Sequence, residues 1–101
     1  MKLLSFKAHD GSRQFLKLPE SVGWNELRDH ITALPGAELT DYLTDHVTEV
    51  WIDFLFRGYK FTVNNQFGEY WFFVDDPDCP EHTLSVVAEH CACRTGLDEK
   101  A

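Results

Sequence analysis

Hydrophobic and polar residues alternate most regularly between residues 49 and 75. The alternation is interrupted twice, at Arg57-Gly58 and at residues 65–68. Turns of two and four residues at these places leave the apolar residues of all three segments on one face. The pattern therefore predicts a three-stranded antiparallel meander with one buried face. That face consists of Val50, Ile52, Phe54, Phe56, Tyr59, Phe61, Val63, Tyr70, Phe72 and Val74.

Two further strands, residues 2–8 and 13–18, are predicted at the N-terminus. A three-residue loop that ends in Gly11 would join them and pair Phe6 with Gln14. A two-residue Asp-Gly loop would instead split the apolar residues between both faces, so we favour the longer loop. The side chains expected on one face are Leu4, Phe6, Ala8, Leu16 and Leu18.

Apolar residues at helical spacing predict two main helices. The first covers about residues 22–34 and ends at Pro35-Gly36, and the last begins at Pro80 and ends at Gly96. Their predicted buried stripes are Trp24, Leu27, Ile31 and Leu34 in the first helix, and Leu84, Val87, Ala88 and Cys91 in the last. Residues 37–48 mix helical spacing with threonines, and we expect a short helix there because a long connection without structure is uncommon.

These elements predict an α+β fold. Their order is strand, strand, helix, short helix, strand, strand, strand, helix, with an N-terminal hairpin and a meander forming an antiparallel sheet and the two main helices packed on one face. The 101 residues suit a single domain, which we place at residues 1–96, with a frayed tail at 97–101.

The second face of the meander is unusually aromatic for a sheet face turned to solvent. The predicted register arranges it in three rows, namely Trp51/Asn64/Glu69, Asp53/Thr62/Trp71 and Leu55/Lys60/Phe73. Burying one large aromatic side chain contributes about 2–3 kcal/mol, so something is expected to cover this face. The candidate binding residues are Trp51, Asp53, Leu55, Asn64, Glu69, Trp71 and Phe73.

Three kinds of cover are compatible with this face. Another segment of the chain could lie over it, a partner protein or a second copy could dock on it, or it could form the floor of a small-molecule pocket. Rigid aromatic residues surrounded by polar groups are enriched at protein interfaces, which favours docking over a pocket.

Composition narrows the classes of partner. The chain carries 17 acidic against 9 basic residues and a net charge of −8, which disfavours binding to nucleic acid. No apolar run reaches the length of about 18 residues that a membrane span needs. Three clustered cysteines do not suit a secreted disulfide framework, so we expect a reduced, cytoplasmic setting without membrane contact.

Candidate chemistry is sparse, and we predict no cofactor and no catalytic residue. Cys79, His82, His90 and Cys93 resemble zinc ligands, but His82 and His90 would lie about 12 Å apart along one helix. A metal would then need further ligands, as in an assembly of several chains. Asp53 and Glu69 could act as an acid–base pair if the aromatic face were a cleft.

One part of the meander resembles a family of small bacterial proteins with no known activity. The residues concerned are WIDF at 51–54, RG at 57–58 and FTVNNQFGEYWFFV at 61–74, about a quarter of the chain. The resemblance implies a bacterial cytoplasmic origin and transfers no functional residue. The expected function is therefore binding, as in an inhibitor or immunity-type protein or a homodimer, and the alternative is a small-molecule-binding protein or an enzyme that uses the same face.

Overall fold

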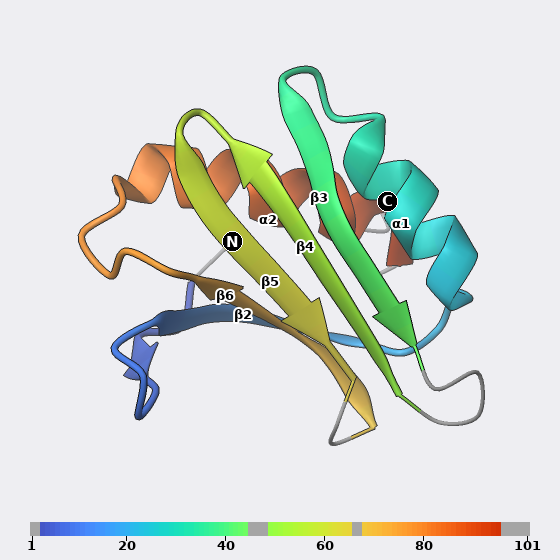
Figure 1. Cartoon of the computed structure of the whole chain (residues 1–101), viewed down its shortest axis with the longest axis horizontal. Coiled ribbons are helices and arrows are strands. Elements are labelled where there is room, and N and C mark those ends of the chain that lie inside the picture. Colours follow the sequence, from blue (N-terminus) through green and yellow to red (C-terminus); the bar gives the residue numbers. More distant parts are fainter. Residues whose placement is uncertain (1–2, 45–48, 66–67, 96–101) are drawn as a thin grey trace.

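The computed structural model describes residues 3–44, 49–65 and 68–95, with the backbone alone for residues 93–95. Six strands and two helices follow one another along the chain (Figure 1). They are β1 (Phe6–Lys7), β2 (Arg13–Pro19), α1 (Trp24–Thr32), β3 (Ala37–Thr44), β4 (Val50–Phe56), β5 (Tyr59–Asn64), β6 (Glu69–Val74) and α2 (Glu81–Thr95). The tail predicted at 97–101 and the helix stop at Gly96 lie outside the described residues.

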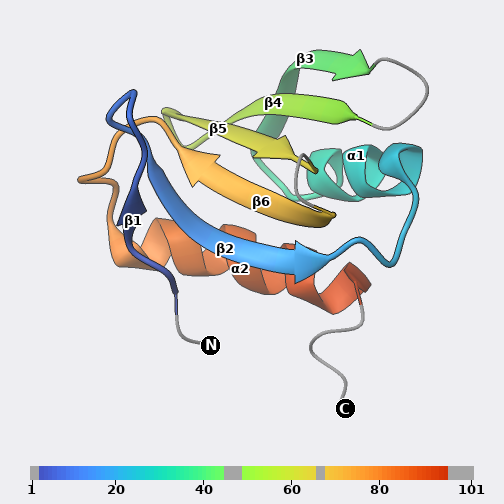
Figure 2. The same ribbon diagram turned by 90° about the horizontal axis from the view of Figure 1, so that it is seen from below.

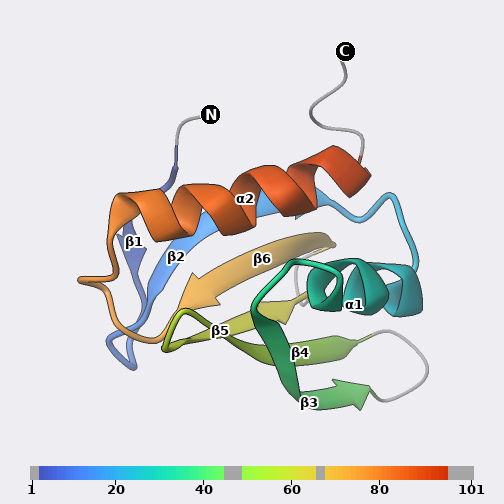
Figure 3. The ribbon, with the colours of Figure 1, turned by 90° about the horizontal axis from the view of Figure 1, so that it is seen from above.

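The strands form one antiparallel sheet in the order β1-β2-β6-β5-β4-β3. Both helices lie on the same side of this twisted sheet, with α2 along β2 and α1 nearer to β3 (Figures 2 and 3). The N-terminal hairpin adds to the meander through the pairing of β2 with β6. The predicted α+β fold, with a hairpin, a meander and two helices on one face, is therefore confirmed.

The core lies between the sheet and the two helices. Phe54 and Phe61 stack with ring centroids 5.1 Å apart, and the edge of Phe15 meets Phe61 at 5.7 Å. Leu27 and Ile31 of α1 and Leu84 of α2 are fully or almost fully buried against them. The stripes predicted for both helices are buried apart from Trp24, which is half-buried at the start of α1.

The two helices also contact each other through a histidine pair. The rings of His30 in α1 and His90 in α2 stack with centroids 3.9 Å apart and planes 4° apart. Each ring Nε2 lies 2.6 Å from the backbone oxygen of the other histidine. A carbonyl oxygen only accepts, so both Nε2 atoms carry the proton in this arrangement.

The short helix predicted within residues 37–48 is wrong for the part that the structure describes. Residues Ala37–Thr44 form the edge strand β3 and pair with β4 over its whole length. Thr40 and Thr44 suit this conformation because β-branched side chains favour strands. Residues 45–48, the rest of the predicted helix, lie outside the described residues.

The predicted register of the meander is correct between β4 and β5 and wrong between β5 and β6. Asn64 pairs with Trp71 and Phe61 pairs with Val74, which is a shift of two residues from the prediction. A shift of two keeps every side chain on its face, so the hydrophobic pattern cannot detect it. Glu69 and Tyr70 extend beyond β5 and pair with β2 instead.

The N-terminal hairpin has the predicted loop but not the predicted apolar face. Gly11 adopts a φ of 92°, and Phe6 pairs with Gln14 as expected. A register shift between Gln14 and Leu16 then turns both Phe15 and Leu16 toward the core. Phe6 consequently lies on the opposite face from Leu16, and its side chain is 64% exposed.

Candidate functional site

One face of the sheet carries no helix and faces the viewer in Figure 1. Pairing across the strands arranges its side chains in rows, which we call the open face. One row is Leu43/Trp51/Asn64/Trp71/Lys17, the next is Asp41/Asp53/Thr62/Phe73/Gln14/Phe6, and the third contains Glu38, Leu55 and Lys60. All candidate binding residues predicted for the second face of the meander lie on the open face. Glu69 lies at its end, opposite Pro19.

The two indoles of the open face flank one amide. Asn64 pairs with Trp51 on one side and with Trp71 on the other. Although no described helix crosses this row, Asn64 is only 8% exposed. Trp71 Nε1 donates to Glu69 Oε1 at 3.3 Å, and the Trp71 ring lies 6.4 Å from that of Phe73. Trp51, Trp71 and Phe73 are thus half-buried side chains on the same face of the sheet.

Acidic residues gather at the β3–β4 side of the open face. Asp53 accepts a hydrogen bond from Thr62 Oγ1 at 2.8 Å and stands directly opposite Asp41 of β3. Glu69 is four residues further along the sheet and two strands away, about 13 Å along and about 10 Å across. This separation exceeds the roughly 5–9.5 Å of paired catalytic carboxylates, so the acid–base pair considered from the sequence does not form.

A groove lies at the opposite side of the open face, between β1 and β6. It has a volume of about 810 Å³. Its lining residues are Leu4, Phe6, Lys7, Ala8, His9, Gln14, Lys17, Trp71 and Phe73. Lys17 pairs with Trp71 and Gln14 with Phe73, so both side chains stand beside the aromatic rings. The groove therefore combines an apolar floor with an ammonium and an amide.

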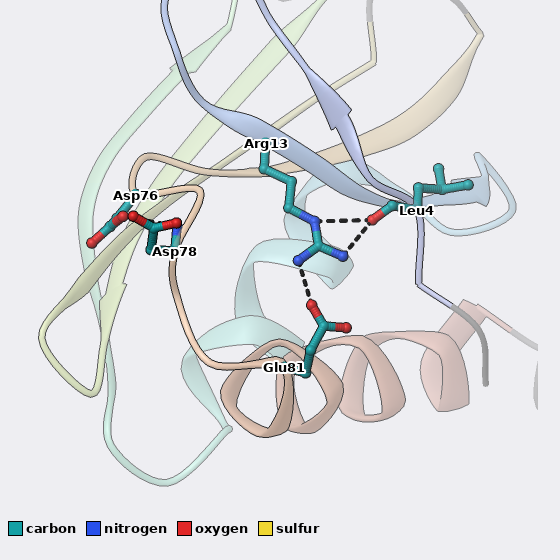
Figure 4. Close-up of polar contacts among 5 residues, drawn as sticks. All are labelled: Leu4, Arg13, Asp76, Asp78 and Glu81. Atoms are coloured by element: carbon teal, nitrogen blue, oxygen red, sulfur yellow. Dashed lines mark hydrogen bonds and ion pairs between the residues drawn. The ribbon is translucent and has the colours of Figure 1, made fainter.

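Arg13 holds the outer wall of this groove in place (Figure 4). Its Nε and Nη2 donate to the backbone oxygen of Leu4 at 3.0 and 2.7 Å. Its Nη1 forms an ion pair with Glu81 in the first turn of α2. The segment before β1 is thereby fixed to the helix layer, which positions Leu4 and Phe6 opposite Trp71.

The tip of the N-terminal hairpin is closed by a local hydrogen-bond pair. Asp10 Oδ1 accepts from the Ser12 backbone N at 3.0 Å and from Ser12 Oγ at 2.7 Å. The backbone hydrogen bond from Ser12, followed by that from its hydroxyl, lowers the pKa of Asp10 below its usual value. A smaller hollow of about 280 Å³ lies between this tip, Phe73 and Trp51.

A third hollow lies at the start of α1. It has a volume of about 850 Å³ and includes Glu20, Trp24, Asn25 and Tyr42 in its lining. Trp24 Nε1 donates to Glu20 at 2.9 Å, and the Tyr42 hydroxyl donates to Asn25 Oδ1 at 2.8 Å. These polar side chains already satisfy one another, in contrast to the groove beside β1.

The zinc-like residues do not come together. Burial raises the pKa of Cys79 to about 11 and that of Cys91 to about 12, so both remain thiols. His82 is exposed, His90 is engaged with His30, and the side chain of Cys93 lies outside the described residues. Among the side chains that are described, no three of His, Cys, Asp or Glu form a group that could hold a metal ion.

The structure adds residues to the open face that sequence reasoning missed. Leu43 joins the Trp51 row only because residues 37–44 form a strand, and its side chain is 56% exposed. Gln14, Lys17 and Phe6 join because β2 lies beside β6 and is bulged. The β-branched Thr40 and Thr44 were the available signal for the strand, whereas the pairing of β2 with β6 had none.

Comparison with known proteins adds no relative. No protein-family model matches the chain, no curated protein matches it, and no solved structure matches its fold. Among the described helices, none is long and apolar enough to cross a membrane. The resemblance to a family of small bacterial proteins therefore stays a prediction.

Proposed function

We propose that this protein is a binding module that docks a basic protein partner on its open face. One observation carries the proposal. The sheet buries one face under two helices, while Trp51, Trp71 and Phe73 gather on the other face with no described element lying across them. Partly buried aromatic residues at the centre of a surface are the usual anchors of a protein interface.

The dimensions of the open face support a protein as the occupant. The molecule measures 34 × 33 × 24 Å, and the view down its shortest axis looks onto this face (Figure 1). A standard interface buries about 800 Å² on each partner, which fits within the two longer dimensions. Around the aromatic anchors, Leu43 and Leu55 are 56% and 38% exposed, which extends the apolar surface toward the edge of the sheet.

Charge favours a basic partner over a second copy. Each chain carries a net charge of −8, so two copies repel each other before contact. Asp41 and Asp53 lie side by side across β3 and β4, and Glu38 lies in the next row. A partner with lysine or arginine opposite these carboxylates would relieve their mutual repulsion and associate faster. In a cytoplasmic setting, an inhibitor or immunity-type role would use such a surface.

The test compares two tryptophan variants as baits. Trp71→Ser removes an anchor of the open face, whereas Trp24→Ser alters a half-buried tryptophan on α1, away from that face. A protein retained by the wild type and by Trp24→Ser, but lost with Trp71→Ser, is then produced in pure form for measurement of its dissociation constant. We expect Trp71→Ser to weaken binding at least about tenfold, and high salt to weaken it further.

Three results would contradict this function. The first is a set of retained proteins that does not distinguish the two variants. The second is an acidic partner, or one whose affinity does not depend on salt. The third is a wild-type dimer in sedimentation that Trp71→Ser dissociates, which would make the open face a self-association surface.

A further inference from the structure

We infer that the groove between β1 and β6 binds a small organic anion with an apolar body, such as an aryl or medium-chain carboxylate. The groove shares Trp71 and Phe73 with the proposed docking surface, but the inference does not depend on protein docking. Three independent features of the groove support the inference, namely the sign of its charges, a glutamine amide in its lining and its apolar walls.

The charged residues of the groove have the opposite sign to the chain as a whole. Its lining includes Lys7, His9 and Lys17, and among the described residues it contains no carboxylate, although the chain carries 17 acidic and 9 basic residues. Lys17 pairs with Trp71 and lines the groove, so its side chain belongs to the open face beside that indole. Since the net charge repels anions elsewhere on the surface, an anion bound here would depend on Lys17.

Gln14 supplies the second feature. Its side chain is 7% exposed, and within the described residues its amide makes no hydrogen bond. No fully enclosed side-chain nitrogen or oxygen in that part of the chain lacks a partner, so the amide atoms of Gln14 are accessible, and Gln14 lines the groove. A ligand oxygen in the groove would accept a hydrogen bond from Gln14 Nε2, which would add to recognition of the carboxylate.

The walls suit the apolar part of such a ligand. Phe6 is 64% exposed and faces the groove from β1, opposite Trp71 and Phe73. Leu4 lines the same wall, and Arg13 holds its backbone. The volume of about 810 Å³ falls within the range of about 300–1,000 Å³ for small-molecule sites. A ring placed between Phe6 and Trp71 would remove the exposed apolar surface of both.

The experiment uses a matched pair of probes, naphthalene-2-carboxylate and its neutral analogue 2-naphthylmethanol. Binding is followed by the indole Nε1–H resonance of Trp71 in ¹⁵N spectra, which is assigned by its loss in Trp71→Phe. We expect the carboxylate to shift this resonance with a dissociation constant below about 1 mM, and the alcohol to bind about tenfold more weakly. The indole resonance of Trp24 should not move.

Charge-removing variants locate the anion. Lys17→Gln should weaken the carboxylate about tenfold and leave the alcohol unchanged. Lys60→Gln is the matched control, because Lys60 lies on the same face in the row of Leu55, outside the groove. Its effect should stay within about twofold. Both lysines are exposed, and an unchanged backbone spectrum confirms that each variant folds.

Several outcomes would overturn the inference. One is the absence of a Trp71 shift at probe concentrations of several times the expected dissociation constant. Another is equal binding of the acid and the alcohol, which would describe a sticky apolar patch without anion recognition. A third is an equal effect of Lys17→Gln and Lys60→Gln. Gln14→Leu provides a second check, because it should weaken the acid more than the alcohol.

Discussion

The histidine pair between α1 and α2 offers a sharp test of the packing of the helix layer. Each imidazole donates through Nε2 to the backbone oxygen of the other residue at 2.6 Å, and the rings stack at 3.9 Å. His30→Ala removes one hydrogen bond and the stack, but it leaves the backbone carbonyl that accepts from His90. His90→Ala does the converse. A double-mutant cycle therefore separates the stack from the two hydrogen bonds.

The expected magnitudes follow from this geometry. One such hydrogen bond contributes about 0.5–1.5 kcal/mol and an aromatic pair about 0.5–1.5 kcal/mol. Each single substitution should therefore lower the free energy of unfolding by about 1–3 kcal/mol. The higher helix propensity of alanine offsets up to about 0.7 kcal/mol of this loss. The double variant should lose less than the sum of the two, by the stacking energy of about 0.5–1.5 kcal/mol.

The measurement is urea unfolding followed by circular dichroism at a fixed pH near 8, where model imidazoles are neutral. Glu89→Ala, at an exposed position of the same helix, controls for the introduction of alanine. The slope of the free energy of unfolding against urea concentration should be the same for all variants, as expected when each of them unfolds in a two-state transition. Additive single effects would refute the stack, and single effects no larger than that of Glu89→Ala would refute the hydrogen bonds as well.

Three further predictions follow from buried or strained positions. In a Cys93→Ser background, the thiols of Cys79 and Cys91 should resist alkylation at pH 8 until urea unfolds the chain, because burial raises their pKa to about 11 and about 12. Alkylation is followed by mass spectrometry, and rapid labelling of the folded protein would contradict the described packing. Burial also raises the pKa of Tyr70 above its ordinary 10.0, so the unfolded phenol ionises first and stability should fall as pH rises beyond about 10. In urea titrations at about pH 9 and about pH 11, Tyr70→Phe should lose less stability between the two values than the wild type, and an equal loss would exclude this phenol as the cause. Gly58→Ala should lower the free energy of unfolding by about 1–2 kcal/mol purely through its φ of 82°, since nothing lies within 4 Å of the added methyl group, and a neutral result would mean a different turn.

The local pattern of apolar and polar residues was sufficient to predict most of the helices and strands and the two faces of the meander. The alternation around the Arg57-Gly58 turn predicted the pairing of β4 with β5 residue by residue, because a two-residue turn allows one register. The spacing of Leu27, Ile31 and Leu34 located α1 in the same way. In both cases the deciding contacts lie a few residues apart in the chain.

The sequence by itself also determined that Trp51, Trp71 and Phe73 share a face turned away from the helices. Its hydrophobic period of two residues requires this in any register that keeps Ile52 and Phe72 in the core. The same period left the rows undetermined, because a shift of two residues costs the core pattern nothing. The hydrophobic period therefore could not predict that Trp71 pairs with Asn64.

Only the tertiary structure decided which segments lie beside the meander and in what register. β2 pairs with β6 between residues that lie 50 to 61 positions apart in the chain, and its bulge sends Phe15 into the core and Phe6 to the open face. β3 forms the edge of the sheet because β4 offers hydrogen-bond partners to residues 37–44. The groove therefore could not be read from the sequence, since its two walls come from β1 and β6 and meet only when the sheet is complete.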